Sequence, residues 1–187
     1  MVLSIRAAVA ADAPELAVLA AVTFPLACPP GSPLDEIDTF VAQNLSVQAF
    51  SQYLADPLRK LFVAQGTSRS GEQRLLAYTM LVDSPPSDSD VAAVVAAQNS
   101  TELSKCYAHP DTHGSGLSAK IMAASLDWAQ QLGRSQVWLG VNQENLRAQG
   151  FYTKHGFTIA GSKRFWLGNR VEHDYVMVRP TGQTTTG

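Results

Sequence analysis

The stretch from Leu103 to Phe157 constrains the fold more than any other part of the chain, because it reads as one complete unit. An apolar-leaning segment leads into a turn with two glycines, and a helix-forming segment follows that Gly133 ends. The expected elements are a strand at 103–108, a turn at 109–116, a helix at 117–132, a strand at 136–142 and a helix from about residue 145 to Gly156. This alternation of strands and helices predicts an α/β fold.

The turn before the first of these helices has the composition of an anion-binding loop. It reads His113, Gly114, Ser115 and Gly116. Free backbone N–H groups and the positive end of the helix dipole meet at such a helix start, and glycine lets a phosphate approach the main chain closely. An ordinary glycine turn explains the same four residues, so the tetrapeptide alone leaves both interpretations open.

The second helix of the unit adds a more specific pattern. Asn145 is followed by Ala148, then by Phe151-Tyr152, and finally by Gly156-Phe157. This spacing resembles the signature after the fifth strand of GNAT-superfamily N-acetyltransferases, and the turn resembles the acetyl-CoA pyrophosphate loop of that superfamily. The loop is a variant, because a histidine stands at its first position and a serine at its last.

Further blocks resemble the PaiA-type branch of the superfamily, the polyamine (spermidine/spermine) acetyltransferases. These blocks are Val137–Val141, Gly161–Phe165 and Asp174–Met177. Together the matches cover most of residues 2–179. The resemblance implies a GNAT fold, with a mixed central sheet of about seven strands and helices on both faces. We expect one domain at residues 1–180 and a disordered tail at 181–187.

The remaining elements follow from periodicity and turn residues. Strands are expected at 2–7, 61–64, 75–82 and 172–178, and an extended segment at 158–167 ends in a turn at 168–169. Helices are expected from Asp12 to Phe24, from Leu34 to Val41, and after a capping Ser46. A hairpin loop is expected at 66–71. A short helix capped by Ser89 or Asp90 is expected near 90–97.

The resemblance implies that acetyl-CoA is the co-substrate. Its pyrophosphate would lie on the loop formed by His113, Gly114, Ser115, Gly116, Leu117 and Ser118, and its pantetheine arm would pair with the strand that ends in Tyr107 and Ala108. Asn145 would lie beside the pantetheine, although capping of its own helix explains this residue equally well. Arg147 and Lys154 are candidates for contact with the 3′-phosphate, or plain surface residues.

Acyl transfer to an amine needs a proton acceptor and a proton donor. An alkyl ammonium has a pKa of about 10.4, so its proton must be removed, and the departing thiolate must receive one. Tyr152 is the predicted general acid, with a core aromatic as the alternative. The resemblance suggests a base on the fourth strand, where Ser104 stands. Glu102 lies two residues earlier, on the same face if the alternation holds, and is the predicted base unless it is a solvent-exposed strand start.

Other polar residues are interpreted more plainly. Tyr107 and His109 are further candidates for relaying a proton, and Cys106 is interpreted as a buried structural thiol. We predict no metal site, because the histidines lack a ligand pattern. Asp35, Glu36 and Asp38 are either an acidic lip for a polyamine or, as we favour, a solvated helix face.

The composition limits which other classes of protein this chain could belong to. The net charge is −2, with 14 basic and 16 acidic side chains and no basic block, which argues against nucleic-acid binding. No apolar run is expected to span a membrane, and the N-terminus does not resemble a signal peptide. Two distant cysteines and this N-terminus favour the cytoplasm.

The function expected from the sequence is N-acetyl transfer from acetyl-CoA to a primary amine of a small molecule, with a polyamine as first candidate. The alternatives are another amine (an aminoglycoside, an amino acid or a protein N-terminus) or a non-catalytic acyl-CoA-binding module. The resemblance also leaves a homodimer open.

Overall fold

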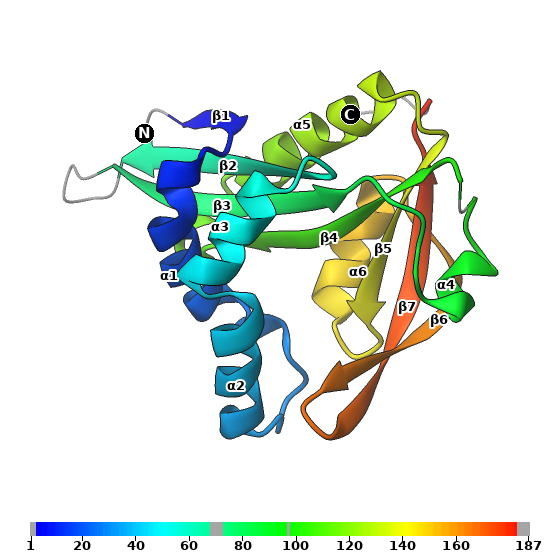
Figure 1. Ribbon diagram of the computed structural model, residues 1–187, viewed down its shortest axis with the longest axis horizontal. Coiled ribbons are helices and arrows are strands. Elements are labelled where there is room, and N and C mark those ends of the chain that lie inside the picture. Colours follow the sequence, from blue (N-terminus) through cyan, green and yellow to red (C-terminus); the bar gives the residue numbers. More distant parts are fainter. Residues whose placement is uncertain (1–2, 68–72, 97, 183–187) are drawn as a thin grey trace.

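The computed structural model describes residues 3–67, 73–96 and 98–182, and it contains a seven-stranded mixed sheet with strand order β1-β2-β3-β4-β5-β7-β6 (Figure 1). This confirms the expected fold class. The strands are β1 (Ser4–Ala7), β2 (Arg59–Thr67), β3 (Gln73–Val82), β4 (Ser100–Ala108), β5 (Gln136–Asn142), β6 (Thr158–Leu167) and β7 (Arg170–Pro180). The α-helices are α1 (Ala13–Thr23), α2 (Leu34–Asn44), α3 (Val47–Ala55), α4 (Ser89–Ala92), α5 (Leu117–Gln131) and α6 (Leu146–Lys154).

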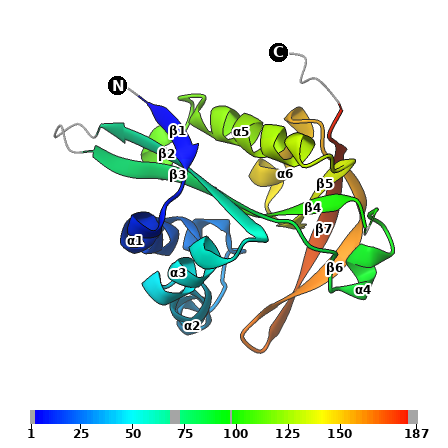
Figure 2. The same cartoon turned by 45° about the horizontal axis from the view of Figure 1, so that its top comes forward.

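Helices cover both faces of the sheet, with α5 on one face and α1, α2 and α3 on the other (Figure 2). The alternation of side chains along β3 explains this arrangement. Tyr78 and Met80 pack into the core cluster that contains residues of α1 and α3, whereas Leu81 packs with residues of α5. Thr79 points the same way as Leu81, and its hydroxyl lies 2.8 Å from the hydroxyl of Ser125 in α5.

The segment Ala10–Ala27, which contains α1, is more apolar than the sequence analysis assumed. Its mean hydropathy is 1.4 over 18 residues, so by length and composition it could cross a membrane, contrary to our expectation. In the fold it packs through Leu16, Leu19 and Ala20 into the core. The Glu15 carboxylate also accepts a 2.6 Å hydrogen bond from the backbone N–H of Leu75 in β3. The apolar composition therefore serves a helix that packs one face into the core, while Val18 and Val22 are exposed on the other side.

The two central strands of the sheet, β4 and β5, are parallel and pair over a short distance only. Residues 100–102 of β4 pair with residues 136–138 of β5, although both strands continue for several residues beyond these pairs. Past this point the strands diverge, and α6 lies next to the opening (Figure 1). A bulge at Ser104 shifts the pairing of β4 with β3, since Leu81 faces Leu103 and Met80 faces Lys105. The divergence creates the space in which the site is built.

Several local features differ from the sequence expectations. The helix near residue 90 has only four residues, and its cap is Asp88, whose carboxylate accepts a hydrogen bond from the N–H of Asp90 at 2.8 Å. Thr181, expected in the tail, is buried and donates a hydrogen bond to the carbonyl of Arg134. Gly66 and Thr67 belong to β2, and the rest of the expected hairpin loop, like residues 183–187 of the tail, lies outside the described residues.

Candidate active site

Two cavities lie where β4 and β5 diverge, and they share a junction. The first has a volume of about 270 Å³ and lies between β4, β5, β7 and the helical layer of α1 and α2. The second, of about 460 Å³, extends along the end of β4 towards the start of α5 and the outer side of α6. The residues that line both are Ala27, Cys106, Tyr107, Asn145, Ala148 and Tyr152. A ligand in either cavity would therefore reach the same few side chains.

The glycine loop lies at the far end of the second cavity. Gly114 and Gly116 have φ values of +79° and +76°, a region that favours glycine, so the loop needs both residues. The N–H groups of Ser115 and Leu117 are bonded within the loop, to the Thr112 carbonyl and to the Ser115 hydroxyl. Those of Gly114, Gly116 and Ser118 have no acceptor among the described residues. These free donors at the start of a 15-residue helix suit a phosphate.

Side chains from three elements complete the second cavity. His113, Ser118 and Ala108 line it, as does Arg147 from α6, whereas Lys154 does not. Burial and the nearby Arg147 both lower the pKa of His113, so the imidazole is neutral at neutral pH in the free protein. Leu117 is fully buried, so its side chain belongs to the core. Only its backbone lies in the loop.

Replacement of Gly116 by alanine tests the loop. A Cβ at this left-handed position costs about 1–2 kcal/mol, so we expect a less stable loop and weaker CoA binding. Gly150, inside α6, is the matched control, since a Cβ there meets no atom within 4 Å and alanine favours helix. Calorimetric titration with CoA should show a several-fold weaker Kd for Gly116→Ala and an unchanged Kd for Gly150→Ala. Equal affinity of all three proteins would contradict this role of the loop.

Tyr152 lies at the junction of the two cavities. Its side chain comes from α6 and is almost fully buried, and its hydroxyl interacts with the Cys106 thiol of β4. Burial raises the pKa of Tyr152 well above its ordinary value, so the phenol keeps its proton at neutral pH. Burial also raises the pKa of Cys106 to about 12, so this residue remains a thiol rather than a thiolate nucleophile.

Asn145 caps its own helix, which is one of the two roles that the sequence analysis considered. Its side-chain oxygen accepts a 3.0 Å hydrogen bond from the N–H of Ala148, which makes it the N-cap of α6. It also lines both cavities. The cap fixes the first turn of α6 and thereby the position of Tyr152 two turns later.

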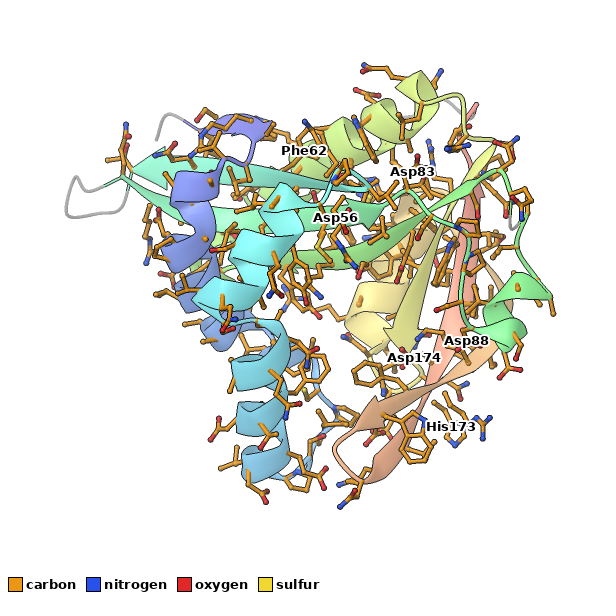
Figure 3. The ribbon with its side chains drawn as sticks, in the orientation of Figure 1. Asp56, Phe62, Asp83, Asp88, His173 and Asp174 are labelled. Atoms are coloured by element: carbon orange, nitrogen blue, oxygen red, sulfur yellow. The ribbon has the colours of Figure 1, made fainter. Side chains whose placement is uncertain are left out.

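Three carboxylates line the first cavity. Glu102, the predicted base, stands on β4, and Glu172 and Asp174 come from β7. In Figure 3 Asp174 lies on the inner side of β7, whereas His173 projects outward. Burial raises the pKa of Glu102 and that of Asp174, against the opposing effect of Lys163 on each. Both are therefore better proton acceptors near neutral pH than ordinary carboxylates.

Sequence reasoning missed four charged residues that line the first cavity, namely Lys105, Lys163, Glu172 and Asp174. A signal existed for the two acids, because residues two apart on a strand share one face. The same argument paired Glu102 with Ser104, but the bulge at Ser104 interrupts the alternation there. Both residues still line the first cavity.

The proposed acidic lip is not part of either cavity. Asp35 and Asp38 are exposed on α2. Glu36 lies against the turn between β6 and β7, where a Cβ on Gly168 would come within 2.9 Å of it. Asp35 and Asp38 are therefore solvated, the interpretation that the sequence analysis favoured, whereas Glu36 is partly buried.

The loop with free amides and the paired cavities suit a transferase of the acyl-CoA-dependent kind. Residues 32–157 match the acetyltransferase (GNAT) family. An uncharacterized N-acetyltransferase of Mycobacterium tuberculosis is 46% identical over 168 residues, which cover 90% of this chain and 97% of that protein. The chain belongs to the GNAT family of N-acetyltransferases, for which acetyl-CoA is the typical co-substrate.

Solved structures agree in fold. The PaiA N-acetyltransferase of Thermoplasma acidophilum, in complex with coenzyme A, superposes with a TM-score of 0.73 at 16% identity, covering 96% of this chain and 99% of that chain. The spermidine/spermine N-acetyltransferase SpeG of Vibrio cholerae gives 0.61 at 19% identity, with coverages of 96% and 92%. At such identities the likeness shows the fold alone.

Proposed function

We propose that this N-acetyltransferase transfers the acetyl group of acetyl-CoA directly to a primary amine of a small molecule, with a polyamine-like amine as first candidate. The observation that carries the proposal is the junction of the two cavities at Tyr152 and Cys106. The second cavity and the glycine loop would hold the co-substrate, and the first would hold the amine. The two reactants then meet without a covalent enzyme intermediate.

The chain supplies each step of this transfer. The free amides at Gly114, Gly116 and Ser118 would bind the pyrophosphate, and Arg147 would add a positive charge beside it. Because β4 loses its partner β5 beyond Glu102, backbone groups towards Tyr107 and Ala108 are available to the pantetheine arm and the acetyl carbonyl.

Proton transfer involves both cavities. Glu102 would accept the proton of the incoming ammonium, directly or through water, with Asp174 as the other buried carboxylate at hand. Tyr152 would donate its phenolic proton to the departing sulfur. The raised pKa values of Glu102 and Asp174 make these carboxylates readier proton acceptors, and the raised pKa of Tyr152 means that the phenol still holds its proton when the sulfur departs.

The charges of the first cavity support a cationic acceptor. Three carboxylates line it against two lysines, and an aromatic wall of Phe24 and Phe40, stacked 4.5 Å apart, suits an alkyl chain. An acceptor that carries an anion beside its amine is the second candidate, because Lys105 and Lys163 line the same space.

Release of free CoA across a panel of amines tests the proposal. We expect turnover with spermidine and spermine, and weaker or no turnover with aminoglycosides, amino acids and peptides with a free N-terminus. Turnover with one of the latter alone would keep the reaction and reject the polyamine. Binding of acetyl-CoA without turnover of any amine would point to a non-catalytic module.

Two further expectations concern the state of the enzyme. We propose that it works in the cytoplasm, where free thiols such as Cys28 and Cys106 persist. We also propose a homodimer, in which the exposed Trp166 of β6 would contribute to the interface. A monomer in light scattering at micromolar concentration would contradict the dimer.

A further inference from the structure

Two lysines line the first cavity, which would hold the amine, and their surroundings differ. Lys163, on β6, forms an ion pair with Asp174 of β7, with 3.9 Å between its Nζ and a carboxylate oxygen. The Lys163 side chain passes β5 at Gly140, where a Cβ would come within 2.6 Å of Lys163 Cε. Gly140 thus leaves the room that this ion pair needs. Lys163 is held as a charged partner of Asp174.

Lys105, on β4, has no such partner. It is partly buried and lines the same cavity, yet within residues 3–67, 73–96 and 98–182 its Nζ makes neither a hydrogen bond nor an ion pair. Its Nζ lies 5.5 Å from the centroid of the Tyr53 ring of α3. The bulge at Ser104 causes this placement, since it aligns Lys105 with Met80 and turns its side chain to the face of α3.

The surroundings of Lys105 favour its neutral form. Burial lowers the pKa of Lys105 to about 8, with Glu102 acting against this shift and Arg59 adding to it. A primary alkylamine that is partly neutral at physiological pH is a nucleophile. The side chain is also a four-carbon amine, which is the chemistry of the acceptor proposed above.

We propose that Lys105 is an internal acceptor, acetylated by the enzyme on its own chain when acetyl-CoA is bound and the amine cavity holds no substrate. The inference rests on the proposed function, because the reaction would use the same second cavity for acetyl-CoA and the same proton donor, Tyr152. Lys105 immediately precedes Cys106 and Tyr107, which line the junction of the cavities. Its flexible side chain would have to rotate away from Tyr53 to reach the thioester.

The step balances without another reactant. The neutral Nζ of Lys105 attacks the thioester carbonyl carbon, a C–N bond forms and the C–S bond breaks. The proton lost by Nζ goes to Glu102, and Tyr152 protonates the departing sulfur, so the products are free CoA and an N-acetyl-lysine. Lys105 then has lost its charge and carries an additional group inside a cavity of about 270 Å³. Acetylation would therefore close the site to amines, and a bound amine would protect Lys105.

Mass spectrometry tests the proposal. The purified wild-type protein is incubated with acetyl-CoA alone and then digested. We expect one acetyl group per chain, at Lys105 and not at Lys163, with a proportional loss of amine turnover. The amine that turns over best in the panel should suppress the modification. Lys105→Arg should carry no acetyl group at this position, and its amine turnover should not fall below its own starting rate during the incubation, because arginine accepts no acetyl group.

Two controls separate enzymatic modification from chemical acetylation. Tyr152→Phe should slow acetylation of Lys105 about 10²-fold or more if the enzyme catalyses it. Equal labelling of the exposed Lys120 and Lys154, or an unchanged rate in Tyr152→Phe, would overturn the proposal. In the free protein, the Lys105 signal after reductive ¹³C-methylation should titrate near pH 8, because burial lowers the pKa of this amine to about 8.

The outcomes also separate this inference from the proposed function. Turnover of amines with an unmodified Lys105 would reject the internal acceptor and leave the transferase activity intact. Modification of Lys105 without turnover of any amine would support the inference and reject the small-molecule acceptor. If acetyl-CoA binds but neither Lys105 nor any amine is acetylated, both the internal acceptor and the proposed function are rejected.

Discussion

Replacing Tyr152 with phenylalanine is expected to lower kcat about 10²-fold or more, because a general acid typically contributes 10²–10⁴-fold. The phenol is buried at the junction of the two cavities, and its raised pKa keeps it protonated. Acetyl-CoA affinity should change little, since the hydroxyl acts on the departing sulfur and not on the pyrophosphate. Steady-state kinetics with the best amine, combined with calorimetry of CoA binding, measures both quantities.

The matched control is Tyr175→Phe. Tyr175 is partly buried against the same core cluster as Tyr152 but lines neither cavity. This variant should keep the wild-type kcat. Equal rates for Tyr152→Phe and the wild type would reject Tyr152 as the acid, and a parallel loss in both variants would indicate a packing effect.

Replacing Glu102 with glutamine is expected to lower kcat/KM by about 10²-fold and to change its pH profile. Glu102 must be ionised to accept a proton, so wild-type activity should rise with pH through the Glu102 pKa, which burial raises above the ordinary range. The variant should lack this limb. A pH series of kcat/KM decides the matter, and an identical acidic limb in the variant would transfer the role to Asp174.

Stability provides an independent readout for the same variant. A carboxyl group whose pKa is raised in the folded state favours folding at low pH, and this contribution is lost as the pH rises from the unfolded to the folded pKa. Above both values Glu102 is a cost to the fold. Glu102→Gln should therefore have a Tm at pH 7 equal to or above that of the wild type. Asp38→Asn, at an exposed position on α2, should change neither rate nor Tm.

The sequence predicted the parts of the fold and site that depend on local patterns. The helix after Gly116, the cap at Asn145 and the end of α6 at Gly156, where φ is +83°, all follow from residues a few positions apart. The family resemblance added the co-substrate that is typical of the family, and it suggested the role of Tyr152, which stays a prediction. The cap of α4 was misassigned because Asp88, Ser89 and Asp90 are all good capping residues, and only the backbone path distinguishes them.

The first cavity could not be predicted in the same way, since it depends on contacts between strands that are distant in the sequence. The bulge at Ser104 leaves no mark in composition, yet it decides which side chains of β4 enter the cavity. The pairing of Lys163 with Asp174 likewise depends on the register of β6 with β7 and on the absence of a side chain at Gly140. Each requires knowing which residues face each other across the sheet.

The short pairing of β4 with β5 has a consequence for how the molecule meets other proteins. Two strands that separate inside a sheet each present an unpaired edge, and an open edge normally invites another chain to add a strand and aggregate. Here both edges face a narrow opening with α6 beside it and residues of the α1 end at its mouth. We expect a flexible cofactor arm to extend along these edges, with α6 standing in the way of a neighbouring sheet. The opening in the sheet would therefore admit a thin, flexible ligand and exclude a second β-sheet.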